Sequence, residues 1–265
     1  MTIIQSIILA IVEGITEFLP ISSTAHMKFT NPVLGLSETP FLDMFEIVIQ
    51  LGAILSVIVL YWKKFVQFGK IRFYVKLLIA LIPAVVFGVL MKKYIDRALN
   101  NLAFIAWVMV AGGIILIFID RFFTRPNIHD DEQISNKNAF VIGCFQVLSI
   151  VFPGLSRSAA TIIGGMSQKL DRSTAAEFSF FLAVPTMLAA SVKSLYDVKK
   201  HNPEVLSQSN LSILLIGSFV AFIVALLAIR FFITYLQKHG FRLFGYYRII
   251  IGLIVLICVY TGLIQ

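Results

Sequence analysis

Residues 12–26 read VEGITEFLPISSTAH and directly follow the apolar segment IIQSIILAI. Two glutamates and a histidine are unusual at the end of such a segment, because a charged side chain at membrane depth is costly. Pro20 lacks a backbone N–H and interrupts a helix, whereas the Ser and Thr residues after it are typical of a helix start. The stretch therefore predicts a helix, a break and a second helix, with polar side chains gathered at the break.

The composition of the 265-residue chain is that of an integral membrane protein. Hydrophobic residues make up 58% of it, charged residues only 14%, and the mean hydropathy is +0.91. A helix needs about 20 apolar residues to cross the hydrocarbon of a bilayer. Six runs approach this length, at about 45–61, 73–91, 102–119, 174–192, 211–232 and 248–263. We expect an all-α membrane protein with six transmembrane helices.

The formal charge of +8 does not indicate nucleic-acid binding. The Lys and Arg residues lie in short loops between apolar runs, where anionic lipid head groups and topology signals place them. If the first hairpin opens to the outside, the inside loops hold twelve basic residues and the outside loops hold seven. This distribution predicts that both termini lie outside.

Two further apolar stretches are too short to cross a membrane. Residues 2–19 end at Pro20 and residues 139–152 end at Pro153, each before a serine-rich turn. A helix pair that enters the membrane and returns to the same side accounts for such a stretch, provided that the freed backbone is buried in protein or lines a wet cavity. We predict two re-entrant helix pairs.

The two stretches also indicate an internal repeat within a single transmembrane domain, residues 1–265. An offset of 133 places Glu13 opposite Gln146 and Ser23 opposite Ser156. Repeat 1 covers about 1–124 and repeat 2 about 138–265, each with one re-entrant pair and three crossings. An odd number of crossings inverts the second repeat, so the two breaks are expected to meet near the midplane of the membrane.

Glu13 and Glu17 lie four residues apart, so their carboxylates share one helical face. Such a pair can hold a divalent cation or share a proton. The alternative is a helix end that faces water, but two glutamates on one face with His26 nearby favour a site. Ser22 can be an N-cap alone, and His26 can be a polar residue at the membrane interface.

The second break, PGLSRSAAT at 153–161, carries the complementary charge. Ser156, Arg157 and Ser158 offer hydroxyls, a guanidinium and the free N–H groups of a helix start. Thr161 lies four residues after Arg157 and hence on the same helical face. This set suits a phosphate group. The alternative is a structural ion pair between Arg157 and a glutamate of the first stretch, and the two interpretations are compatible.

Together, EGITEFLPISSTAH and PGLSRSAAT closely resemble the motifs of the bacterial undecaprenyl-diphosphate phosphatases of the bacitracin-resistance type. The resemblance covers nearly the whole chain. It implies hydrolysis of undecaprenyl diphosphate to the monophosphate carrier of peptidoglycan synthesis, in the bacterial plasma membrane. It further implies an active site on the periplasmic or extracellular side and dependence on Mg²⁺ or Ca²⁺. The family's functional positions fall on Glu13, Glu17, Ser23, His26, Ser156, Arg157 and Thr161.

These residues suggest a division of roles. Binding of the diphosphate is expected from Ser22, Ser156, Arg157, Ser158 and Thr161, and binding of the cation from Glu13 and Glu17. Ser23 is the candidate nucleophile, with Glu17 or His26 as its base; alternatively, an activated water attacks and Ser23 only binds phosphate. The expected partners are the polyprenyl diphosphate and the bilayer, and the oligomeric state is left open, a homodimer included.

Two other classes of protein share parts of this pattern. PISSTAH loosely resembles the PSGH element of the phosphatidate-phosphatase type, but that class needs a second His with an Asp four residues later, and His129, His201 and His239 lack it. A transporter or polyprenyl-lipid translocator uses the same kind of inverted repeat, and Glu46 and Glu177 suit a proton relay. The density of catalytic side chains favours the enzyme.

Overall fold

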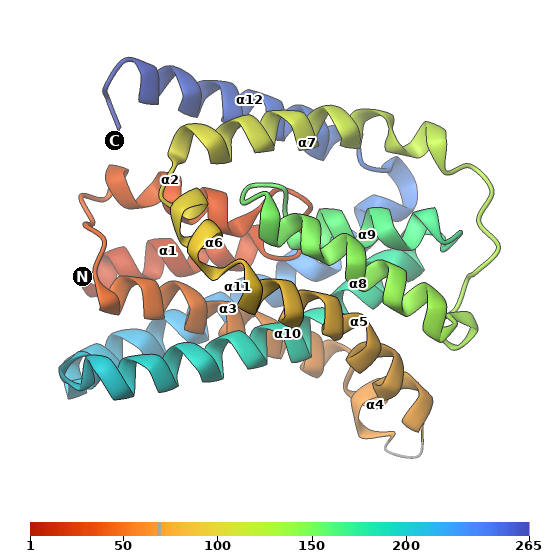
Figure 1. Ribbon diagram of the computed structural model, residues 1–265, viewed down its shortest axis with the longest axis horizontal. Coiled ribbons are helices and arrows are strands. Elements are labelled where there is room, and N and C mark those ends of the chain that lie inside the picture. The colour runs from red at the N-terminus through yellow and green to blue at the C-terminus, as the bar shows by residue number, and fades with distance from the viewer. Residues whose placement is uncertain (68–69, 265) are drawn as a thin grey trace.

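The computed structural model describes residues 1–67 and 70–264. Within these ranges the fold is helical, with one isolated bridge between Ile128 and Leu170 and no strand. Six of the described helices are long and apolar enough to cross a membrane, as predicted. They run along the long axis of the molecule (Figure 1) and are α3 (Pro40–Leu60), α5 (Ile71–Leu90), α7 (Leu102–Phe122), α10 (Arg172–His201), α11 (Gln208–His239) and α12 (Arg242–Tyr260).

The helix boundaries differ most from the prediction in α10 and α11. These helices contain 30 and 32 residues, and at about 1.5 Å per residue both exceed the roughly 30 Å of hydrocarbon. Their extra turns carry polar residues such as Lys199 and Lys238, so hydropathy alone ended them too early. Four short elements in the connections were not predicted: α4 (Trp62–Val66), α6 (Lys92–Leu99), η1 (Asp131–Gln133) and η2 (Pro203–Leu206).

The two helix–break–helix predictions are confirmed. The first pair is α1 (Ile3–Thr16) and α2 (Ser23–Val33), and the second is α8 (Asn136–Val151) and α9 (Arg157–Ser167). The Gln5 side chain near the start of α1 donates to the Leu34 carbonyl after α2, at 3.0 Å. The Asn138 side chain likewise donates to Gln168 after α9, at 3.4 Å. Each pair therefore enters the molecule and returns to the end from which it started.

The turns of the two pairs have related but unequal geometry. Ser22 and Ser156 are the N-caps of α2 and α9, and their φ angles are 73° and 76°. Ser22 is two residues after Pro20, whereas Ser156 is three residues after Pro153. Gly154, at φ 99°, is the extra residue of the second turn. The structural counterpart of Ser156 is therefore Ser22, one position away from the pairing that the uniform offset gave.

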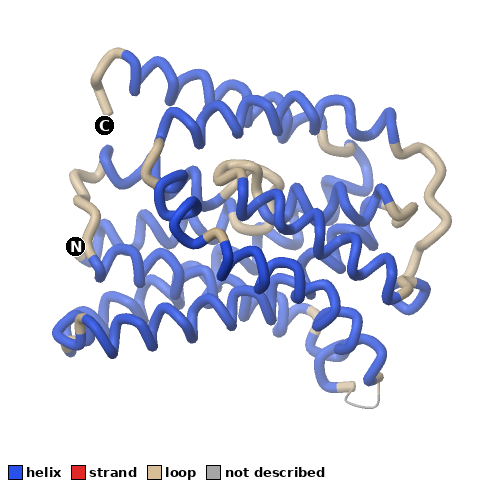
Figure 2. Tube along the Cα trace, in the orientation of Figure 1, coloured by secondary structure: helices blue, strands red, loops and turns tan. Residues whose placement is uncertain are grey.

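Both turns lie in the centre of the molecule, surrounded by helices, where Figure 2 shows them as loops. The Ser158 hydroxyl donates to the Leu19 carbonyl at 2.9 Å and so joins one turn to the other. Arg248 of α12 is fully buried and donates to the carbonyl oxygens of Pro20, Gly154 and Leu155 at 3.1, 2.9 and 2.7 Å. The two turns are thus held in one place by hydrogen bonds that cross the chain.

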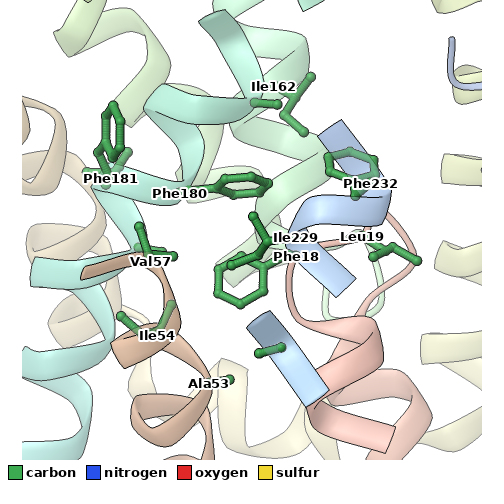
Figure 3. Close-up of a cluster of buried hydrophobic side chains, with 14 of the residues drawn as sticks. Phe18, Leu19, Ala53, Ile54, Val57, Ile162, Phe180, Phe181, Ile229 and Phe232 are labelled. Carbon is green, nitrogen blue, oxygen red and sulfur yellow. The ribbon is translucent and has the colours of Figure 1, made fainter. Parts of the chain in front are cut away.

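A core of aromatic and aliphatic side chains packs beside the first turn (Figure 3). The Phe18 ring meets Phe180 edge to face, with 5.1 Å between centroids, and Phe180 also packs against Phe232 at 6.0 Å. Since α10 and α11 supply the two partner rings, the packing sets the position of the residue that follows Glu17. Both chain termini lie at the same end of the molecule (Figure 1).

Candidate active site

Two adjoining cavities lie between the turns, with volumes of about 60 and 210 Å³. Both are lined by residues that flank the breaks and by one residue of α10: Ser22, Thr24, Ser156, Arg157 and Met187. Glu17, Ser23 and Gln50 line only the smaller cavity. The larger one extends to the apolar side chains of Ile95, Leu99 and Ile150. The candidate site is therefore polar at the turns and apolar on the side of α6.

The N-termini of α2 and α9 meet at these cavities. The Ser22 hydroxyl accepts from the Ala25 N–H at 3.4 Å, and the Ser156 hydroxyl accepts from the Ala159 N–H at 3.3 Å. Each serine is therefore an N-cap, as the alternative interpretation of Ser22 proposed. The other N–H groups of a first helical turn have no partner within the helix and favour an anion. Two such helix ends facing one cavity suit a group with two phosphates.

Glu17 lies between a cation and a hydroxyl. Its Oε1 accepts from Arg157 Nη2 at 2.9 Å, in an ion pair that joins the two broken helices. Its Oε2 accepts from the Ser23 hydroxyl at 2.5 Å. The predicted pairing of Arg157 with a glutamate is confirmed, and the contact places a carboxylate where it can remove the proton of Ser23.

Arg157 is oriented by a second set of contacts. Its Nη1 donates to the Ser179 carbonyl at 3.1 Å, while its Nε has no partner among the described residues. The Thr161 hydroxyl bonds the Ser179 hydroxyl at 2.6 Å and the Arg157 carbonyl at 2.8 Å. Neither Thr161 nor Ser158 lines the two cavities. In this structure both residues support the segment that carries Arg157.

His26 lies one helical turn beyond Ser22. Its Nδ1 bonds the Ser22 carbonyl at 2.7 Å and must carry the proton, so its Nε2 accepts from the Tyr247 hydroxyl at 2.9 Å. The two rings stack with 5.6 Å between centroids. Of the two candidate bases, it is Glu17 that contacts Ser23.

Glu13 is fully buried, and neither of its carboxylate oxygens has a hydrogen-bond partner among the described residues. A buried carboxylate without a partner is strongly disfavoured, and a cation held with Glu17 would satisfy it. Residues 1–67 and 70–264 contain no group of three or more His, Cys, Asp or Glu arranged for a metal. Mg²⁺ is nevertheless often bound by one or two carboxylates together with substrate phosphates, so the glutamate pair fits a divalent cation.

The two glutamates considered for a proton relay have polar partners of their own. Glu46 accepts from the Asn31 amide at 2.6 Å and lies 3.7 Å from the Lys28 ammonium. Glu177 accepts from the Tyr61 hydroxyl at 3.4 Å. Neither residue lines the two cavities. Their contacts account for their presence without a relay.

Sequence reasoning missed several residues around the site. Gln50 and Met187 line the cavities, and Tyr247 holds the His26 ring. The signal for Gln50 was a polar residue inside the apolar run EIVIQLGA, four positions after Glu46. Hydropathy makes Arg248 the first residue of an apolar run, but α12 begins at Arg242. An arginine nearly two turns inside a membrane helix was the signal that could have identified it.

Larger hollows occur near the ends of the helices, with volumes of about 480, 630 and 530 Å³. Charged residues line them, and several of these form ion pairs: Asp120 with Arg172, Lys193 with Asp197, and Lys70 with Glu132. Among these cavities of the described residues, the two central ones combine buried charge, a hydroxyl and two helix N-termini. They are therefore the candidate active site.

The fold and the cavity together define a polytopic membrane protein with a buried polar site between two broken helices. The chain belongs to the bacitracin resistance protein BacA family, whose model matches residues 6–254. An undecaprenyl-diphosphatase of Flavobacterium johnsoniae is 54% identical over 97% of this chain and 96% of its own length. Proteins of the same name from Porphyromonas gingivalis and Bdellovibrio bacteriovorus are 47% and 43% identical, each over 99% of this chain and 98% of their own length.

The Glu17–Arg157 pair generates a prediction about stability. Arg157→Gln leaves the Glu17 carboxylate buried without a counterion, and we expect it to lower the free energy of unfolding by about 3 kcal/mol. Adding Glu17→Gln removes the unpaired charge and should restore at least half of that loss. SDS-induced unfolding in mixed micelles measures both effects. The exposed pair Lys193 and Asp197 is the control, because replacing both residues by Gln should lower the free energy of unfolding by less than about 1 kcal/mol. Equal losses of stability in Arg157→Gln and in the double variant with Glu17→Gln would contradict the prediction.

Proposed function

We propose that this chain hydrolyses undecaprenyl diphosphate to undecaprenyl phosphate and inorganic phosphate. The reaction would recycle the lipid carrier of peptidoglycan synthesis and confer bacitracin resistance. The observation that carries the proposal is the position of Glu17, which contacts both the Arg157 guanidinium and the Ser23 hydroxyl between two helix N-termini. The curated relatives named undecaprenyl-diphosphatase support it.

The topology that goes with this function has inverted repeats in one transmembrane domain. Repeat 1 would cover about residues 1–124 and repeat 2 about 138–265, with α1–α2 and α8–α9 as re-entrant pairs. The return of each pair to its starting end, at Gln5 and at Asn138, supports this arrangement. With the more basic loops inside, the first pair opens outside and the site faces the periplasmic or extracellular side of the bacterial plasma membrane.

The diphosphate would bind at the N-termini of α2 and α9. Arg157 would turn from Glu17 to the phosphate oxygens, for which its planar fork provides two donors. Ser22 and Ser156 would contribute at the helix ends that they cap, while Ser158 and Thr161 would keep the Arg157 segment in place. The lipid tail would leave along the apolar side of the larger cavity, past Ile95, Leu99 and Ile150.

In the reaction, the Ser23 Oγ would attack the terminal phosphorus while Glu17 accepts the hydroxyl proton. The bond from phosphorus to the bridging oxygen would break, and undecaprenyl phosphate would leave. Water would then hydrolyse the phosphoserine and release inorganic phosphate. His26 is one helical turn from Ser23, and its Nε2 would take the proton of that water after the Tyr247 hydroxyl moves away from Nε2.

Glu13 and Glu17 would hold a divalent cation, Mg²⁺ or Ca²⁺. When bound, it would neutralise the charge that develops on the leaving phosphate. Glu13 suits this role because its oxygens have no other partner among the described residues. Glu17 would share its carboxylate between the cation and the Ser23 proton.

Phosphate release from undecaprenyl diphosphate by the purified protein in detergent tests the function. We expect Arg157→Lys to lower kcat/KM by roughly 100-fold, because a point charge cannot replace a planar pair of donors at the phosphate. Arg230→Lys on the exposed face of α11 is the matched control and should keep the wild-type rate. Release at a normal rate by Arg157→Lys would exclude Arg157 as the clamp, and no release by the folded wild type with Mg²⁺ or Ca²⁺ would refute the proposed function.

The cation proposal makes a separate prediction. EDTA should abolish phosphate release, and added Mg²⁺ or Ca²⁺ should restore it. Glu13→Gln should raise the metal concentration for half-maximal activity by roughly tenfold, the lower end of the effect of losing a metal-site partner. Glu204→Gln, at an exposed position of η2, is the control. An unchanged metal requirement in Glu13→Gln would remove Glu13 from the cation site.

Rapid acid quench of the reaction with substrate labelled in its terminal phosphate distinguishes the two routes of attack. If Ser23 is the nucleophile, His26→Gln should slow the second step and accumulate label on Ser23, detected by peptide mass spectrometry. Ser23→Ala should carry no label. If His26→Gln turns over slowly but never carries phosphate on Ser23, water attacks directly and Ser23 only binds the phosphate.

A further inference from the structure

Arg248 is a buried cation without a carboxylate partner in the part of the chain that the structure describes. Its side chain is fully inaccessible to solvent, and its donors reach only backbone carbonyl groups: Met109, Pro20, Leu155, Gly154 and, at 3.5 Å, Val108. A buried charge is costly unless all of its hydrogen bonds are made. The family motifs in the sequence do not include this residue, so the role of the charge needs an explanation.

The absence of a side chain at Gly112 makes room for the Arg248 guanidinium. A Cβ on Gly112 of α7 would lie 2.3 Å from Arg248 Nη2, so any side chain there would displace the head group. The space opens toward the second turn, where Leu155 and Gly154 accept from Arg248 at 2.7 and 2.9 Å. The packing of α7 against α12 thus places the Arg248 side chain against the second turn, next to the candidate site.

The shortest of these hydrogen bonds orients a peptide group at the cavity. A trans peptide is planar, so the N–H of Ser156 points opposite to the Leu155 carbonyl that Arg248 binds. The neighbouring N–H groups are used inside their own turns, since Leu155 donates to Phe152 at 3.0 Å and Ile21 donates to Leu19 at 2.7 Å. The hydrogen bonds of the described residues include none from the Ser156 N–H, and Ser156 lines both cavities.

We infer that Arg248 is a positioning residue for the proposed phosphatase reaction: by binding the Leu155 carbonyl, it directs the Ser156 N–H into the cavity as a backbone donor to the phosphate. This inference rests on the proposed function. The charge of Arg248 also polarises the peptide group that it binds, which strengthens the N–H on the other side. Donors fixed in advance at the site of developing negative charge are among the largest contributions to catalysis.

A pair of glycine variants separates positioning from simple packing. Gly112→Ala crowds the guanidinium but leaves its charge in place. Gly252→Ala crowds the same α7–α12 contact at Val110, with its new Cβ 2.7 Å from a valine methyl, and does not touch Arg248. We expect Gly112→Ala to lower kcat on the order of 10- to 100-fold with a much smaller change in KM, and Gly252→Ala to stay within roughly threefold of wild-type kcat.

Rates are compared per folded molecule, with the thermal unfolding midpoint of each variant measured in the same detergent. Arg248→Lys is the second variant, and its single ammonium cannot bind both turns, so its kcat should fall at least as far as that of Gly112→Ala. If Arg248 were only structural, both glycine variants would lower the unfolding midpoint and keep the wild-type kcat. That result, or equal losses of kcat in Gly112→Ala and Gly252→Ala, would overturn the inference.

A binding measurement separates failure of this inference from failure of the proposed function. Orthovanadate mimics a phosphoryl group in the transition state of its transfer. The affinity of such an analogue depends on the hydrogen-bond donors that act during the reaction. In isothermal titration calorimetry of the solubilised protein, Gly112→Ala should bind vanadate roughly tenfold more weakly than wild type and Gly252→Ala. If wild type releases no phosphate from undecaprenyl diphosphate but the difference in vanadate affinity appears, the proposed substrate is refuted and the role of Arg248 stands. Equal vanadate affinities, or no vanadate binding by any of the three proteins, would refute the role of Arg248.

Discussion

The hydrogen bonds from Arg248 to the carbonyl groups of the two turns are the interaction on which the rest of the structure depends. A helix that stops inside a protein leaves carbonyl groups without partners, and buried carbonyl groups need another donor. Here two helices, α1 and α8, stop at the same place, and one guanidinium serves both. The broken helices are tolerated because a third segment of the chain, α12, replaces the hydrogen bonds that they lack.

The ion pair of Glu17 and Arg157 adds a second link between the turns, with a different property. Its two charges compensate each other, and both side chains are buried, with 10% of Arg157 and 6% of Glu17 exposed, so the arginine has a counterion before any anion binds. In the proposed reaction, an incoming phosphate would offer Arg157 the same kind of partner, and the exchange would release Glu17 next to the Ser23 hydroxyl. Binding of the substrate and availability of the base would therefore be coupled through one side chain.

Much of this arrangement could be predicted from the sequence. The six long helices follow from hydropathy, and the two breaks follow from Pro20 and Pro153 with the polar residues around them. The pairing of Arg157 with a glutamate followed from charge at membrane depth. What the sequence could not give were contacts set by tertiary packing: the choice of Glu17 over His26 as the neighbour of Ser23, the extra residue that Gly154 adds to its turn, and the burial of Arg248. Local patterns carry no information on which carbonyl groups an arginine of a distant helix will reach.

The place of Arg248 in the chain has a consequence for how the protein is made. Arg248, which binds both turns, follows Leu155 of the second turn by 93 residues along the chain. Because a chain emerges from its N-terminal end, both turns are made before α12, and until α12 is made their carbonyl groups lack this partner. The polar site is therefore completed only when α12 packs against α7. Formation of the site is thus coupled to the packing of a helix that is distant from both turns in the sequence.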